Sequence, residues 1–257
     1  MYLTFANIVR RILRILYITL LGRPNFKESA NDDFKVAIIG GGFSGIAMAV
    51  NLQKRGFHNF TIFEKAEDVG GVWLKNKYPG AGCDIGSHLY SFSFALNFNW
   101  SKLWSPRNEI WEYIRKVVDD FKLKSKIKYN TEVVSCTWQA KNGTWKMVEK
   151  SIGLTGEQNV FKVHNFNIVI RATGGQSIPK IPNFKGINKF KKPNFHTANW
   201  DDSVDLSGKR VGIVGTGASA VQLVPAIAEK VKELYVFQRS ATWVPKRKFN
   251  RNYGQFA

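Results

Sequence analysis

The sequence predicts an α/β protein in which two strand-helix-strand units each open on a glycine-rich turn. A short apolar, β-branched run at 34–39 ends in Gly40, Gly41 and Gly42, and a second run at 210–214 ends in a similar turn at Gly215. In both places a stretch with helical periodicity and another short apolar strand follow. Strands that alternate with helices in this way are typical of parallel sheets.

In the first unit, we expect a helix over 44–55 that ends at Gly56 and a second strand over 60–63. The glycine-rich and aromatic stretch 70–100 shows little periodicity, which is unusual in a compact domain unless the segment lines a site. Ser105 and Pro106 predict a helix start, with Ser105 as the cap and Pro106 as the first helical residue, and the helical pattern continues to Phe121.

Beyond that helix the apolar period changes to two. Residues 128–138 and 144–149 flank Asn142-Gly143, a strong hairpin signal, and 161–163 and 167–171 supply further strands. We therefore expect an inserted β-meander before the chain returns to the first sheet. In the second unit, a helix over 218–230 and a strand over 234–237 follow the strand at 210–214.

Composition excludes several classes of protein. The 257 residues are 44% hydrophobic, enough for a real core, and the two cysteines, Cys83 and Cys136, fit no disulfide framework or metal-ligand spacing. No metal is therefore expected, and a reducing cytoplasm is the expected location. The formal net charge of +19 is spread along the chain. Since no nucleic-acid-binding module accompanies it, we expect a lysine-rich solvated surface rather than a nucleic-acid partner.

The first 22 residues form a separate basic, amphipathic segment. Residues 8–21 are strongly apolar but are interrupted by Arg10, Arg11 and Arg14, so the stretch is too short and too charged to span a bilayer. As a helix it could lie on an anionic membrane surface, which would make the protein peripherally membrane-bound, or pack on the body of the protein. Both alternatives stay open.

The first glycine turn has the pattern of a dinucleotide-binding, Rossmann-like unit. Gly40, Gly42 and Gly45 form G-x-G-x-x-G between a strand and a helix, where a pyrophosphate can approach the backbone at the helix N-terminus. Glu64 ends the following strand, at the distance expected for an acceptor of hydrogen bonds from a ribose diol.

The second turn has the same glycine spacing as the first, but the strand that follows it ends in different residues. Gly215, Gly217 and Ala220 repeat the spacing, whereas the next strand ends in Gln238, Arg239 and Ser240 with no acid. An arginine there can pair with a 2′-phosphate that a carboxylate would repel. The two turns therefore predict an unphosphorylated adenosine ribose at the first, as in FAD, and NADPH at the second.

From the sequence we expect four parts along the chain. A basic segment and linker occupy 1–33, an FAD-binding domain with the inserted meander 34–178, a connector 179–207, and an incomplete NADPH-binding domain 208–257.

One stretch is more specific than either turn. Residues 70–84 read GGVWLKNKYPGAGCD, which resembles the Baeyer-Villiger monooxygenase signature [A/G]-G-x-W-x4-[F/Y]-P-[G/M]-x3-D at every fixed position. A second family stretch, F-x-G-x3-H-x3-W-[P/D], is matched by Phe190, His196, Trp200 and Asp201, although Lys192 replaces its glycine. The resemblance covers roughly residues 34–245 and indicates the N-terminal half of a flavin-dependent monooxygenase of this family.

The resemblance implies contacts for individual residues. Val72, Trp73, Asp84, Tyr90 and the backbone at Val133 would contact FAD, and Gly82, Cys83 and Asp84 would approach the nicotinamide. Asp84 is also the candidate for tuning or positioning a catalytic group. The full set of candidate cofactor-binding residues is Gly40, Gly42, Phe43, Ser44, Gly45, Glu64, Lys65, Gly71, Val72, Trp73, Gly82, Cys83, Asp84, Tyr90, Val133, Thr173, Gly174, Gly215, Thr216, Gly217, Ser219, Ala220, Arg239 and Ser240.

The family chemistry implied is reduction of FAD by NADPH, reaction of the flavin with O2 to a C4a-peroxide, and oxygenation of a ketone, sulfur or nitrogen centre of a small organic substrate. The family's essential arginine would come after residue 257, so we expect this chain by itself not to be a competent oxygenase. The alternative is a catalytically inactive FAD-binding remnant at a membrane surface. A flavin-linked disulfide reductase is disfavoured because no redox cysteine pair is present.

Overall fold

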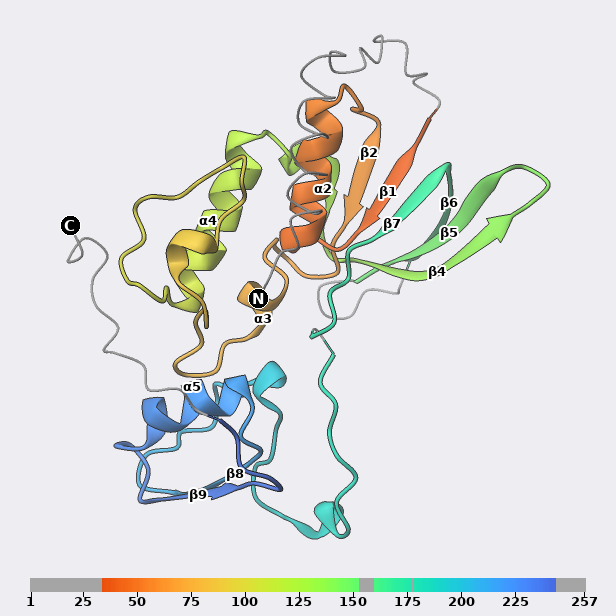
Figure 1. Ribbon diagram of the computed structural model, residues 1–257. Coiled ribbons are helices and arrows are strands. Elements are labelled where there is room, and N and C mark those ends of the chain that lie inside the picture. The colour runs from red at the N-terminus through yellow and green to blue at the C-terminus, as the bar shows by residue number, and fades with distance from the viewer. Residues whose placement is uncertain (1–33, 153–159, 177, 244–257) are drawn as a thin grey trace, which may run out of the picture.

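The computed structural model describes residues 34–152, 160–176 and 178–243 (Figure 1). Its central sheet has four parallel strands in the order β3-β2-β1-β7. Their bounds are β1 Val36–Ile39, β2 Phe60–Phe63, β3 Ile127–Lys128 and β7 Ile168–Arg171. β1, α2 (Phe43–Lys54) and β2 form the first strand-helix-strand unit, close to the bounds that the sequence predicts.

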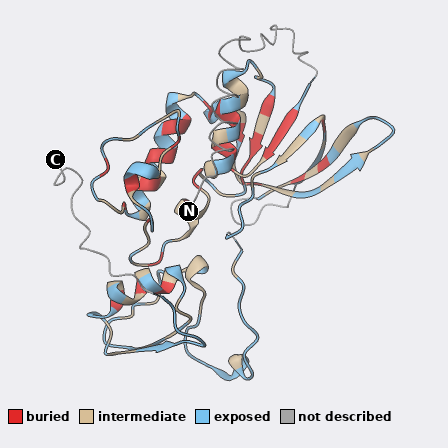
Figure 2. Ribbon diagram, viewed as in Figure 1, coloured by how far each residue is buried: buried red, intermediate tan, exposed pale blue. Residues whose placement is uncertain are grey.

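The side chains of β1 and β2 alternate between two faces of this sheet, as strand geometry requires. Val36, Ile38 and Ile62 join a core cluster with residues of α2 and α4 (Arg107–Asp120). Ala37 and Phe63 instead meet Met147 and Phe166 in a separate cluster. The sheet is thus buried on both sides, between helices and the meander, which Figure 2 shows as red segments of β1 and β2.

The inserted meander is confirmed as a three-stranded antiparallel sheet of β4 (Thr131–Gln139), β5 (Thr144–Ser151) and β6 (Val160–Phe166). The expectation of one strand over 128–138 was wrong. Ile127 and Lys128 pair with β2 in the parallel sheet, and the chain turns at Asn130, whose φ is 49°, before β4 begins.

The helix α4 begins one residue later than expected, with Pro106 as its cap residue rather than its first helical residue. Ser105 does not cap it, because the Ser105 side chain is fully buried and its hydroxyl lies 2.8 Å from the Ser87 hydroxyl. Between β2 and α4 the chain forms two short helical pieces, α3 (Val72–Lys75) and a 3₁₀ helix at Ser87–Leu89.

The second unit consists of β8 (Arg210–Val214), α5 (Ala218–Ile227) and β9 (Glu233–Phe237), with β8 and β9 parallel. α5 ends at Ile227 rather than Lys230, since the Lys230 N–H donates to the Ile227 carbonyl three residues back and so leaves the i→i−4 pattern of an α-helix. A long, largely exposed connector joins β7 to this unit and carries short 3₁₀ helices at Ile187–Lys189 and Thr197–Asn199 (Figures 1 and 2).

Within the described residues, none of the helices is long and apolar enough to cross a membrane. The basic segment 1–22, for which membrane contact was one of two expectations, lies outside the described residues.

Candidate functional site

The first glycine turn sits where the carboxyl ends of β1 and β7 meet the start of α2. Gly40 has a φ of 108°, and a Cβ there would lie 2.5 Å from the Ala172 carbonyl oxygen. A Cβ on Gly45 would lie 1.9 Å from the Gly40 oxygen. Gly42 is the cap residue of α2, and no described side chain caps the helix there, so the first N–H groups of α2 are available to an anion.

Glu64 lies directly beside this turn and is buried. Its Oε2 accepts a 2.6 Å hydrogen bond from Gly41 N–H, and its Oε1 accepts a 2.9 Å bond from Ala66 N–H. A carboxylate offers about four acceptor positions. Glu64 can therefore hold the turn in place and still accept a hydrogen bond from a ligand hydroxyl.

Residues 70–71 of the signature stretch lie against the same turn. Gly70 N–H donates to the Gly41 carbonyl at 3.0 Å. A Cβ on Gly71 would approach the Gly42 Cα to 3.2 Å, so the two backbones meet with hydrogens only between them. Gly70 faces α4 instead, where a Cβ would lie 2.7 Å from Trp111 Cδ1. The missing side chains create the flat backbone surface that a diphosphate needs.

Aromatic side chains form one wall next to this backbone surface. The Trp73 indole N–H donates to the Tyr90 hydroxyl at 3.2 Å, and the two rings pack edge to face at 5.3 Å. Phe43, the first residue of α2, packs edge to face on Tyr90 at 5.2 Å. Burial raises the pKa of Tyr90, which keeps this hydroxyl protonated and able to donate. Phe43, Trp73 and Tyr90, three of the predicted cofactor-binding residues, are thus brought together.

Two lysines lie near Glu64. The Lys65 ammonium group is 4.0 Å from a Glu132 carboxylate oxygen. The pKa of Lys75 is lowered, first by burial and then by the nearby Lys65 charge. Ser44, at the start of α2, is exposed. This side of the first turn is therefore basic and accessible, which suits an anionic ligand.

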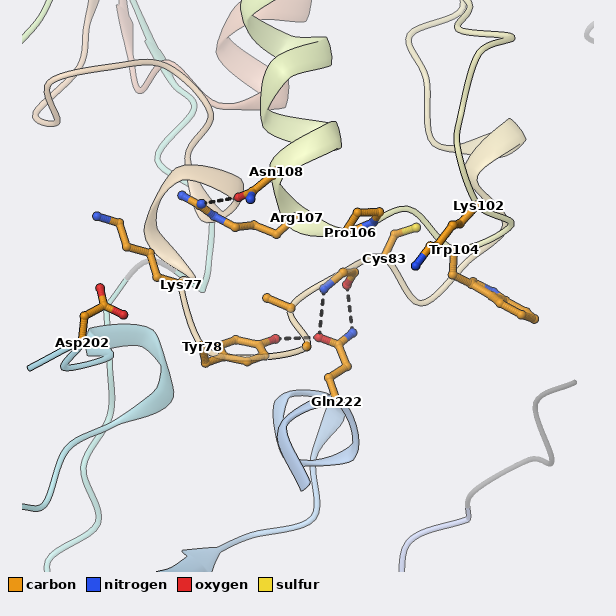
Figure 3. A pocket seen from close by; sticks show the side chains of 13 residues that line it. Lys77, Tyr78, Cys83, Lys102, Trp104, Pro106, Arg107, Asn108, Asp202 and Gln222 are labelled. Atoms are coloured by element: carbon orange, nitrogen blue, oxygen red, sulfur yellow. Dashed lines mark hydrogen bonds between the residues drawn. The ribbon is translucent and has the colours of Figure 1, made fainter. Parts of the chain in front are cut away.

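The later half of the signature stretch, residues 78–84, lies on α5 and borders a cavity of about 640 Å³ (Figure 3). Gly82 and Cys83 line this cavity, together with the basic side chains of Lys77, Lys102 and Arg107. Burial raises the pKa of the Cys83 thiol, which disfavours the reactive thiolate. Asp84 is exposed, and its Oδ1 accepts a 2.7 Å hydrogen bond from the Gln222 side chain.

The second glycine turn repeats the geometry of the first. Gly215 again has a φ of 108°, and Gly217 caps α5. A Cβ on either glycine would meet no described atom within 4 Å, so the turn is open on its outer side. Ala220, in the first turn of α5, is buried. The Thr216 hydroxyl lies 2.7 Å from the Thr242 hydroxyl. Arg239 and Ser240 are exposed directly after β9.

The remaining predicted residues fall in three places. Thr173 and Gly174 follow β7 next to Gly40, where the Thr173 Cα would lie 3.5 Å from an added Cβ on Gly40. Val133 lies earlier in the chain, on β4 at an irregularity between Val133 and Ser135. Ser219 lies in the first turn of α5. Among the described residues, no group of three or more His, Cys, Asp and Glu side chains could hold a metal ion.

Gln222 and Tyr78 were not among the site residues predicted from the sequence. Tyr78 lies in the signature stretch and Gln222 on α5, and the contact between them joins the two segments. The Tyr78 hydroxyl donates to Gln222 Oε1 at 2.8 Å, and the ring is buried against Leu223 and Ile227. A polar Gln222 in a helix of otherwise mostly apolar residues was the available signal, but the pattern alone does not say what it faces.

Comparison with known proteins identifies the family of this chain. The sequence model of the flavin-binding monooxygenase-like family matches residues 33–255. The chain belongs to this family.

Within the flavin-binding monooxygenase-like family, the chain is similar to Baeyer-Villiger enzymes. It is 40% identical over 220 residues to a Baeyer-Villiger monooxygenase of Streptomyces coelicolor, which covers 86% of this chain and 40% of that protein. It also resembles a structure of cyclohexanone monooxygenase with bound ε-caprolactone, with a TM-score of 0.73 and 33% identity over 86% of this chain and 42% of that one.

A third relative is the structure titled OTEMO in complex with FAD and NADP, with a TM-score of 0.75 and 31% identity over 87% of this chain and 42% of that one. The chain thus spans about 40% of the length of these relatives.

Proposed function

We propose that this chain provides the two nucleotide sites of a Baeyer-Villiger-type monooxygenase that uses NADPH, FAD and O2 to oxygenate a ketone or a sulfur or nitrogen centre. The observation that carries the proposal is the contact between Gly42 and Gly71, which joins the uncapped start of α2 to the signature stretch. A glycine turn alone would support nucleotide binding in general, whereas this contact also involves the stretch at 70–84 that resembles the Baeyer-Villiger signature.

The residues present fit FAD at the first turn. The start of α2 supplies N–H donors for the diphosphate, and Gly42 and Gly71 leave the space that side chains would fill. Glu64 is in position to accept from a ribose hydroxyl. Trp73 and Tyr90 form an apolar wall suited to a planar ring system.

The residues present at the second turn fit NADPH. The start of α5 repeats the anion-binding arrangement, and Arg239 and Ser240 follow β9 where a carboxylate would select an unphosphorylated ribose. The guanidinium group of Arg239 can pair with a 2′-phosphate through two parallel hydrogen bonds. We keep the division into an FAD-binding part at 34–178 and an NADPH-binding part at 208–257 as part of this proposal.

Bound flavin would supply the redox and oxygen chemistry. The chain's own residues bind and orient the two cofactors. The backbone at Gly40–Gly45 and Gly215–Ala220 holds phosphates, the Phe43, Trp73 and Tyr90 group excludes water from one side, and Asp84 provides a carboxylate held in a fixed position by Gln222. The substrate of the cyclohexanone monooxygenase relative makes a cyclic ketone a reasonable first compound to test.

Nucleotide titrations with Arg239→Ala test the cofactor assignment. In the FAD-loaded chain we expect Arg239→Ala to weaken NADPH binding roughly tenfold or more and to leave NADH binding unchanged, since it removes a charge-assisted pair with the 2′-phosphate. Arg210→Ala is the matched control, because Arg210 is also exposed but starts β8 at the opposite end of the two-stranded sheet. Equal losses for NADPH and NADH would refute the assignment.

A further inference from the structure

The side chain of Gln222 joins the two nucleotide-binding units through four hydrogen bonds, and Figure 3 shows those to Tyr78 and to the Gly82 backbone. Its Oε1 accepts from the Tyr78 hydroxyl at 2.8 Å and from Gly82 N–H at 3.3 Å. Its Nε2 donates to the Gly82 carbonyl at 2.9 Å and to Asp84 Oδ1 at 2.7 Å. A glutamine amide has two acceptor positions and two donor hydrogens, so its full capacity is used here.

This network fixes the orientation of the amide. Turning the amide over would place Nε2 against the Gly82 N–H donor, and would place Oε1 against the Gly82 carbonyl and the Asp84 carboxylate. All three contacts would then be repulsive. Only a primary amide in this orientation satisfies all of these groups, which neither a leucine nor a glutamate of similar size can do.

Close backbone packing surrounds the amide. A Cβ on Gly80 would lie 2.5 Å from the Gln222 carbonyl oxygen and 3.0 Å from the Ala226 Cβ, so the turn at Gly80 rests directly on α5. Tyr78 is 7% exposed and packs with Leu223 and Ile227 inside the core of the second unit. The 78–84 segment is therefore attached to α5 by packing as well as by hydrogen bonds.

The attached segment continues without a break to the first nucleotide turn. Gly71, near the start of the signature stretch, touches Gly42, while Gly217 of the second turn caps α5 five residues before Gln222. One short path of backbone thus runs from the first turn through residues 71–84 and Gln222 to the second. Movement of one turn relative to the other must break or stretch the Gln222 contacts.

We propose that Gln222 is a positioning residue that couples the two nucleotide sites and holds Asp84 between them; the proposal rests on the function proposed above. Occupation of the first site orders residues 71–84 and, through Gln222, the start of α5. A ligand at the first site therefore raises affinity at the second, and the effect is reciprocal.

The experiment is a binding cycle with the complete 257-residue chain. NADP⁺ affinity is measured by calorimetry with and without saturating FAD, and FAD affinity by quenching of flavin fluorescence. The variants are Gln222→Leu, which removes all four hydrogen bonds, and Gln222→Glu, which keeps the size and loses both donors. Glu229→Gln, in the exposed turn after α5, is the control. Urea unfolding of each variant shows whether it is folded.

In the wild type and the control, we expect FAD to strengthen NADP⁺ binding by roughly tenfold, within the usual range of coupling between sites. In the folded Gln222→Leu protein the ratio should fall to within about twofold of unity. In Gln222→Glu the ratio should be lost at neutral pH and recover in part as the pH is lowered, because a protonated glutamic acid regains one donor. A role in folding alone would lower the urea midpoint of the folded variants and leave this ratio at its wild-type value.

The outcomes separate the two proposals. If the wild type binds neither nucleotide, the proposed function fails. If the wild type binds both but shows no coupling, or if both folded variants keep the wild-type ratio, the role of Gln222 is overturned.

Discussion

Replacing Glu64 by glutamine separates the two roles that the carboxylate of Glu64 has in this structure. Its two oxygens accept hydrogen bonds from Gly41 N–H at 2.6 Å and Ala66 N–H at 2.9 Å, in a site where the residue is only 7% exposed. Glutamine keeps one acceptor oxygen but presents an NH2 group to the other N–H. One charge-assisted hydrogen bond is lost and a buried donor is left without its partner.

The magnitude follows from those two losses. A hydrogen bond to a charged group contributes about 1.5–3 kcal/mol, and a buried donor without a partner costs about 1–3 kcal/mol, with the two estimates overlapping. We expect Glu64→Gln to lower the free energy of unfolding by about 2–3 kcal/mol, roughly a 30- to 160-fold change in the unfolding equilibrium. The matched control is Glu132→Gln, whose carboxylate is 40% exposed and 4.0 Å from Lys65, and which should change stability by less than about 0.5 kcal/mol.

Urea unfolding followed by tryptophan fluorescence measures both variants, with an unchanged slope as the sign of an unchanged transition. FAD affinity of the folded Glu64→Gln protein is measured in parallel, and it should also fall, since the ribose acceptor is weakened. A change in unfolding free energy below about 0.5 kcal/mol for Glu64→Gln would refute the role assigned to these hydrogen bonds.

Three further predictions concern the frame of the site. Gly45→Ala should abolish folding or FAD binding because its Cβ would lie 1.9 Å from the Gly40 oxygen, whereas Gly56→Ala, in open space at a φ of 82°, should cost only about 1 kcal/mol by urea unfolding. Burial raises the pKa of Tyr78, Tyr90, Tyr113 and Tyr129, so the stability that they contribute should be constant below about pH 10 and fall as the pH rises through their folded-state values. The unfolding free energy measured against pH checks this, and a flat profile above about pH 10 would contradict the burial of these side chains. Alkylation by iodoacetamide, followed by mass spectrometry, should modify Cys136 before the fully buried Cys83; the reverse order would contradict the packing of residues 83–87.

Local pattern predicted the parts of the fold whose contacts are close in sequence. The strand at 36–39, the helix after it and the strand at 60–63 lie within 30 residues, and so do β8, α5 and β9. In both units the glycine turn marks the strand end and the apolar periods of two and 3.6 separate strand from helix. The hairpin at Asn142-Gly143 belongs to the same class, although its loop occupies residues 140–143.

Contacts between distant segments were beyond local pattern. The break between β3 and β4 depends on β3 finding a place beside β2, more than 60 residues earlier, which no period in 128–138 records. Ser105 has the character of a helix cap, yet burial beside Ser87 uses its hydroxyl otherwise. The candidate site shows the same division, because each glycine turn was visible alone, while the contacts of Gly71 with Gly42 and of Gln222 with Gly82 come from tertiary packing.

The central claim is that the first turn binds FAD across the backbone at Gly42. Gly42 has an ordinary extended conformation, with φ −82° and ψ −170°, and a Cβ there would lie 3.5 Å from the Gly71 Cα and 3.8 Å from its nitrogen, both normal contacts. Gly42→Val is therefore expected to fold, while its side chain occupies the approach of the diphosphate to the backbone.

Fluorescence titration of FAD into the wild type and Gly42→Val is the most direct measurement. We predict one FAD per wild-type chain and an affinity at least about tenfold weaker for Gly42→Val, with the unfolding free energy changed by no more than about 1 kcal/mol. Equal FAD affinity in the two folded proteins, or no FAD binding by the wild type, would contradict the claim.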